Sequence, residues 1–174
     1  MNTNWRITKI KVKKGEYFFA WEIYQKPTKN WDKYSLNCKD FPREEFKESL
    51  QKMANHVTQI CEFEESATKK IVVSGISLSY TDKNRYLVIT ALKDLTNSKS
   101  PLIINTPARP EMSDGAVTAE FCMSKELVWD LENLVEEALR YINGDRAQQK
   151  LDFDEQKNTL PAGGSETGET RAAG

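Results

Sequence analysis

Three apolar runs separated by polar turn clusters occupy residues 70–107. The first run, Ile71–Tyr80, alternates apolar and polar side chains, which is typical of a strand with one buried face. Gly75 inside this run indicates a bulge or a bend. The second run, Tyr86–Leu92, is apolar on both faces, which predicts a central strand covered on both sides. Prolines bracket the short third run, Leu102–Ile104, as is typical of an edge strand. The stretch predicts an antiparallel β-meander.

The N-terminal part of the chain has the pattern of a β-hairpin. Its strands are Trp5–Val12 and Tyr17–Tyr24, joined by a polar turn that contains Gly15. A third strand is expected at Tyr34–Cys38. In the second strand, one face carries Tyr17, Phe19, Trp21 and Ile23, and the other carries Phe18, Ala20 and Tyr24.

Two amphipathic helices are predicted. The first begins near Pro42, and its apolar positions recur at spacings of four and three. They are Phe46, Leu50, Met53, Val57 and Ile60. We expect this face to pack on Val72, Ile76, Leu78, Val88 and Leu92 of the meander. The second helix is capped by Ser124 and ends near Asn143-Gly144. Its apolar face comprises Leu127, Leu131, Leu134, Val135, Ala138 and Ile142.

The order of these elements predicts an α+β fold, with a largely antiparallel β-sheet and two amphipathic helices packed on it. A last strand is expected at Ala116–Cys122. We expect residues 1–147 to form a single α+β domain without an internal repeat. Residues 148–174 contain few large apolar side chains, which predicts a flexible, disordered C-terminal tail that carries a short linear motif.

Composition narrows the class of protein. The chain has 174 residues, a net charge of −1 and no apolar run of the roughly 20 residues that a membrane span needs. Residues 1–14 lack the apolar core of a signal peptide. Cys38, Cys61 and Cys122 are odd in number and widely spaced, which favours free thiols in a reducing compartment. We therefore expect a cytoplasmic protein that does not associate with membranes.

No motif for catalysis, a cofactor or a metal is recognisable in the chain. There is no Walker loop, nucleophile elbow, HExxH or CxxC sequence. The only histidine, His56, flanks the apolar stripe of the first helix and is expected at a boundary or surface position. We expect no enzymatic activity.

The N-terminal hairpin combines basic and aromatic residues. Residues 1–39 contain nine lysines or arginines against three acids, a net charge of +6, so the remainder of the chain carries −7. Proteins bind single-stranded nucleic acid by stacking its bases on exposed aromatic rings and by contacting its phosphates with lysines. The candidate nucleic-acid contacts are Lys9, Lys11, Lys13, Lys14, Phe18 and Tyr24. The alternative is that the hairpin aromatics belong to the core and the lysines line a solvated strand face.

A short pattern occurs where the last helix meets the tail. Gln148, Leu151 and Phe153 form a Q-x-x-L-x-F sequence, which resembles the hexapeptide class of bacterial sliding-clamp-binding motifs, with Gln149 in place of the usual leucine. A peptide of this kind inserts apolar side chains into a groove while a glutamine bonds at the rim. The alternative is that Leu151 and Phe153 fold back on the domain.

The stretches Ile89–Pro107 and Tyr141–Phe153 resemble a group of uncharacterised bacteriophage and prophage proteins. Their genes often lie among replication and recombination functions, and the similarity covers residues 5–153. The resemblance implies a phage-borne, intracellular, non-enzymatic accessory protein that acts inside the bacterial host cell. The segment after Phe153 departs from that group, which tends to end at the Q…F motif.

Three functional hypotheses follow. The first is a phage accessory protein of DNA replication or recombination that acts by protein–protein interaction, with the sliding clamp as partner. The second is a counter-defence protein that inhibits a host nuclease. This nuclease would be a host defence protein, and it would bind the acidic face of the second helix. The acids of this face are Glu126, Asp130, Glu132, Glu136 and Glu137. The third is a single-stranded DNA-binding protein that contacts DNA directly.

Overall fold

The computed structural model describes residues 4–113 and 118–147. Within these ranges one antiparallel sheet has the strand order β3-β2-β1-β4-β5-β6, and β7 pairs with β5 beside β6. The strands are β1 (Trp5–Lys13), β2 (Glu16–Gln25), β3 (Asn30–Cys38), β4 (Ile71–Tyr80), β5 (Arg85–Lys93), β6 (Leu102–Asn105) and β7 (Arg109–Pro110). The helices are α1 (Glu44–Ile60) and α2 (Lys125–Ile142), with the short 3-10 turns η1 (Glu65–Lys70) and η2 (Ala119–Phe121).

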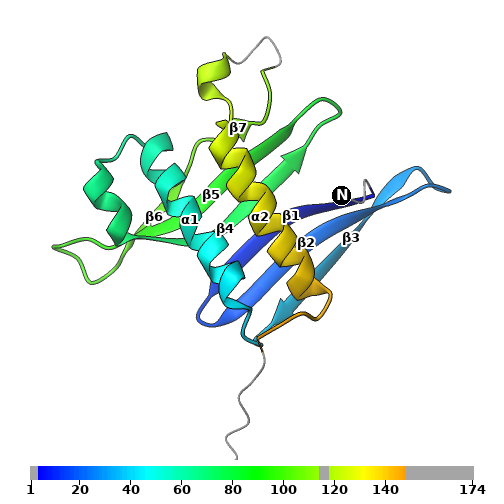
Figure 1. Ribbon diagram of the computed structural model, residues 1–174, viewed down its shortest axis with the longest axis horizontal. Helices are drawn as coiled ribbons and strands as arrows, with labels where there is room; N and C mark the ends of the chain where they lie inside the picture. The colour runs from blue at the N-terminus through cyan, green and yellow to red at the C-terminus, as the bar shows by residue number, and fades with distance from the viewer. Residues whose placement is uncertain (1–3, 114–117, 148–174) are drawn as a thin grey trace, which may run out of the picture.

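Both long helices lie side by side on the same face of the sheet (Figure 1). The predicted α+β fold, an antiparallel sheet with two helices packed on it, is confirmed. The Ser124 hydroxyl accepts a bond from the Leu127 amide at 3.1 Å, so the predicted cap of α2 is present. Among the described residues, no helix is both long and apolar enough to cross a membrane. The predicted tail, residues 148–174, lies outside the described residues.

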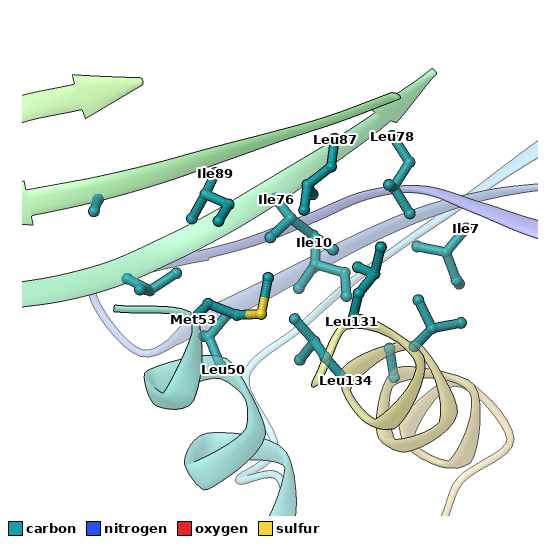
Figure 2. Close-up of a cluster of buried hydrophobic side chains, with 14 of the residues drawn as sticks. Ile7, Ile10, Leu50, Met53, Ile76, Leu78, Leu87, Ile89, Leu131 and Leu134 are labelled. Carbon is teal, nitrogen blue, oxygen red and sulfur yellow. The ribbon is translucent and has the colours of Figure 1, made fainter. Parts of the chain in front are cut away.

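The core fills the space between the helices and the sheet (Figure 2). Buried side chains of β1, β4 and β5 meet those of α1 and α2, and the labelled ones are Ile7, Ile10, Leu50, Met53, Ile76, Leu78, Leu87, Ile89, Leu131 and Leu134. An aromatic cluster closes one end of this core. Phe19 lies 4.9 Å from Tyr141 and 5.6 Å from Phe46, measured between ring centroids. The hairpin face that starts at Tyr17 therefore faces the core.

The first half runs β1-β2-β3-α1, and the second runs β4-β5-β6 and then, after the short β7, to α2; the two halves join through β1 and β4. Ile10 pairs with Ile76 at the centre of this contact. In each strand a bulge falls two residues earlier, at Thr8 and at Ser74, where the register shifts. The two halves of the described chain therefore resemble each other in the order of their main elements, although they differ in turn lengths and side chains.

The bulge at Ser74 also changes the buried face of β4. Val73 is buried while Val72 is 53% exposed, so the prediction that Val72 packs under α1 is wrong. In β5 the buried residues are Leu87, Ile89 and Ala91. Val88 and Leu92 lie on the opposite face and are only half-buried, because no helix of the described residues covers that side. The prediction that β5 is covered on both faces is therefore wrong.

The strand expected at Ala116–Cys122 is not present in its described part, 118–122. Ala119–Phe121 form a 3-10 turn instead, in which the Cys122 amide bonds to the Ala119 carbonyl. The neighbouring edge of β5 is occupied by Arg109–Pro110, which pair with Leu87 and Tyr86.

Candidate nucleic-acid interface

The face of the sheet opposite the helices is open, and it carries the predicted lysines of β1. Lys9, Lys11 and Lys13 alternate with core residues, so all three side chains project from the open face and are exposed. Alternate residues of a strand lie about 7 Å apart, so the ammonium groups form a regular row. Strand alternation therefore converts a basic stretch of sequence into a basic line on one surface.

Phe18 lies at the centre of this basic row. It pairs with Lys11 on one side and with Asn37 of β3 on the other. A shallow depression surrounds its half-buried ring, and its lining is formed by Lys9, Lys11, Lys13, Glu16, Phe18 and Asn37. A flat apolar ring surrounded by ammonium groups and an amide is suited to stacking on an unpaired base.

The acidic side chains of β2 on the open face already have basic partners. Glu16 lies 3.3 Å from the Lys39 ammonium, and Glu22 lies 2.6 Å from the Arg6 guanidinium. Lys9, Lys11 and Lys13 have no carboxylate within 4.0 Å among the described residues. Their charges therefore remain available to an anionic ligand.

A second shallow depression continues across the centre of the sheet. Lys9 and Lys11 line both depressions, and the floor of the second one consists mainly of small or polar side chains. They are Ser74, Gly75, Ser77, Val88, Thr90 and Asn105. Asn105 accepts a bond from the Thr90 hydroxyl at 2.9 Å, which leaves its amide NH₂ group free to donate.

The remaining two predicted contacts lie apart from Phe18. Tyr24 packs on Trp31, with the ring centroids 5.2 Å apart, and the Arg6 guanidinium covers the Trp31 ring at 3.8 Å. Lys14 lies in the β1–β2 turn with a φ of 51°. The structure therefore brings four of the six candidate residues together, namely Lys9, Lys11, Lys13 and Phe18.

The acidic residues of α2 lie on the other side of the sheet, and most of them are already paired. Asp130 bonds to His56 at 2.8 Å, and Glu132 lies 2.6 Å from Arg85. Glu136 and Glu137 contact Arg140. Among the described residues, Glu126 is the only acid of this face without such a partner. The predicted acidic face therefore presents much less free charge than its sequence indicates.

His56 lies in the interior, contrary to its expected boundary position. Its side chain is 2% exposed, and it joins α1 to α2 through the bond to Asp130. In the described ranges no three histidine, cysteine or acidic side chains cluster as metal ligands would.

A cleft of about 390 Å³ separates α2 from the sheet where β1 and β4 diverge. Tyr80 lines this cleft, and its hydroxyl donates to the Ile7 carbonyl at 2.8 Å. Burial raises the pKa of Tyr80, although Arg85 and Arg6 oppose this effect. Arg85 is held there by Glu111 at 3.0 Å and by Glu132, so the cleft contains an ion network in which two carboxylates share one guanidinium.

Gln148, Leu151 and Phe153 of the predicted clamp motif lie outside the described residues. The last described residue, Ala147, donates its amide to the Phe41 carbonyl at 3.1 Å. This bond fixes the point from which the motif continues.

No protein-family model, no curated protein and no solved structure matches this chain. The resemblance to bacteriophage proteins therefore stays a prediction. Sequence reasoning missed Asn37 and the polar floor around Gly75, because their positions depend on strand pairing across the two halves. The alternation of lysines with apolar residues in β1 was the available signal for the basic row.

Proposed function

We propose that this protein binds single-stranded nucleic acid on the open face of its sheet. The observation that carries this proposal is the row of unpaired lysines on the open face. Lys9, Lys11 and Lys13 lie there without carboxylate partners among the described residues, while the acids of α2, most of them paired, lie on the other face. The overall charge of −1 therefore does not describe the field that a ligand meets at the open face.

The chemistry of the open face favours a single strand over a duplex. Phe18 lies in a shallow depression, where its ring can stack only on a base that is not already paired. Reading a duplex through the major groove requires a projecting helix or a two-stranded ribbon, and within the described residues neither projects from this face. The lysines supply phosphate contacts that do not depend on sequence.

The test is fluorescence anisotropy with a labelled oligothymidine of about 16 nucleotides at low salt. The variant Lys9→Gln/Lys11→Gln/Lys13→Gln should weaken binding by at least about tenfold, because three phosphate contacts are lost. The matched control changes three exposed lysines outside the open face and should leave affinity unchanged. These control positions are Lys52, Lys69 and Lys125.

A ring variant separates stacking from charge. Phe18→Ala should weaken binding by about 1–3 kcal/mol while the net charge stays the same. No binding by the wild-type protein at micromolar concentration would reject the proposal. An equal loss of affinity in the control variant would also reject it, because only a diffuse charge effect would remain.

We also propose a protein partner for this chain. Gln148, Leu151 and Phe153 dock on a bacterial sliding clamp, and the protein thereby serves DNA replication or recombination without enzymatic activity. Support comes from the Ala147–Phe41 bond, which holds the exposed Ala147, the residue before the motif, at the surface of the protein. Calorimetric titration of a peptide spanning residues 145–155 against the clamp tests it. Binding should require both Leu151 and Phe153, and binding that persists in the double alanine variant would reject the motif.

A further inference from the structure

The outer edge of the sheet at β6 is apolar and lacks charged side chains that would discourage pairing with another strand. Ile103 is 66% exposed and Leu102 is 46% exposed, and the strand carries no charged residue. At the opposite edge, β3 contains both Asp32 and Lys33, which are side chains that discourage pairing with another strand. The two edges of the sheet therefore differ in their capacity to accept a further strand.

An apolar row leads across the open face to this edge. Val72 pairs with Leu92, and Leu92 pairs with Ile103, so the three side chains adjoin across β4, β5 and β6. Val72 is 53% exposed because no helix or loop of the described chain covers it. This row is separate from the basic row, which lies over β1 and β2.

The hydrogen-bonding groups at the edge are limited to a short segment. The Thr106 amide donates to the Ile89 carbonyl at 3.0 Å, so the even-numbered residues of β6 face β5. The amides of Ile103 and Asn105 consequently face outward. Pro101 and Pro107 occupy the next outward positions in each direction and have no N–H group to donate. The edge therefore accepts a strand about as long as β6 itself.

We propose that β6 pairs in antiparallel fashion with β6 of a second copy of this chain. Pairing centred on Ile103 brings the two apolar rows end to end, so that Ile103 meets Ile103 of the second copy and the row Val72, Leu92, Ile103 continues into its counterpart. A second copy matches the edge in length, in apolar character and in lack of charge. The same relationship already joins the two halves of one chain, where β1 and β4 pair around Ile10 and Ile76.

The geometry of such a dimer follows from the sheet. A two-fold axis perpendicular to the sheet keeps the helices of both copies on one side and both open faces on the other. The two basic rows then lie at the distal parts of one continuous surface. This inference does not depend on nucleic-acid binding, because neither edge residue belongs to the basic row.

Light scattering after size-exclusion chromatography, over a dilution series, tests the proposal. The wild-type protein should show twice the 20.0 kDa mass of one chain, and Ile103→Lys should be monomeric. The matched control is Trp129→Lys, which changes a similarly exposed apolar side chain, 67% exposed, on the opposite face. It should leave the dimer intact.

Ile103→Thr distinguishes loss of the dimer from loss of the fold, because threonine keeps the branched shape and the β-propensity of isoleucine. It should weaken the dimer by about tenfold, while its urea unfolding midpoint stays close to that of the wild type. A monomeric wild-type protein would overturn the proposal. A dimer that survives Ile103→Lys, or one that Trp129→Lys also disrupts, would overturn it as well.

Discussion

Ile10 and Ile76 face each other across the antiparallel contact of β1 and β4, and each side chain is 1% exposed. This pair lies at the centre of the only strand contact that joins the two halves of the described chain. The contact contains three residue pairs, from Lys9–Ser77 to Lys11–Gly75. Small changes at this position should therefore affect the whole sheet.

Gly75→Ala should strongly destabilise the protein. A Cβ atom at this position would lie 2.1 Å from the Ile10 carbonyl oxygen, which is main chain and has no alternative rotamer. This steric clash can be relieved only if β1 and β4 move apart. We expect a loss of about 1–3 kcal/mol in the free energy of unfolding, measured by urea titration. Ser77→Ala, in the same strand, is the control and should change stability by less than about 0.5 kcal/mol.

The bond between His56 and Asp130 should stabilise the packing of α1 against α2. Its atoms lie 2.8 Å apart, and His56 is 2% exposed, so removal of Asp130 leaves a buried imidazole without this partner and removal of His56 leaves a partly buried carboxylate without it. His56→Ala and Asp130→Ala should each cost about 1–3 kcal/mol. In a double-mutant cycle the combined loss should be smaller than the sum of the single losses. Strictly additive losses would contradict a direct interaction.

Stability should fall in alkaline solution because of two buried tyrosines. Burial is the first cause of a raised pKa at both Tyr80 and Tyr141. Their hydroxyls donate to the carbonyls of Ile7 and Asp40 at 2.8 and 2.7 Å, which also favours the protonated form. The unfolded chain loses these protons near pH 10 while the folded chain retains them. The stabilisation is therefore complete below about pH 10 and is lost as pH rises above that value.

Urea titrations at several pH values between about 8 and 11 measure this effect. Tyr80→Phe and Tyr141→Phe should each lower stability at neutral pH and flatten its decline in alkali. Tyr34→Phe, at a ring that is 41% exposed, is the control and should retain the wild-type slope. An unchanged slope in both buried variants would show that other groups cause the decline.

The sequence pattern predicted the elements well, because periodicity reports which face of an element is buried. The four-and-three spacing of α1 placed Phe46, Met53 and Val57 in the core, where they are at most 1% exposed. Periodicity failed at β4, because one extra residue at Ser74 reverses the faces on either side of it. It also failed at β5, where apolar side chains on the open face imitate a strand that is covered on both sides.

The candidate site was less accessible to sequence reasoning. The lysines of β1 were recognisable because they alternate with core residues along one strand. Asn37 adjoins Phe18 only because β2 pairs with β3, and Gly75 adjoins Lys11 only because β1 pairs with β4. Such neighbours are set by strand register between distant segments, which one sequence does not encode locally. The pairing of Glu132 with Arg85 and of Asp130 with His56 likewise joins distant segments, whereas Arg140 contacts Glu136 and Glu137 within one helix.

The salt dependence of binding to single-stranded DNA tests the central claim most directly. Each phosphate contact contributes about 0.7 to the slope of log affinity against log salt concentration. If Lys9 and Lys11 neutralise phosphates, Lys9→Gln/Lys11→Gln should reduce the magnitude of that slope by about 1.4. The exposed pair Lys52→Gln/Lys125→Gln should leave it unchanged. Equal slopes for the wild type and the Lys9/Lys11 variant would contradict the assignment of the open face.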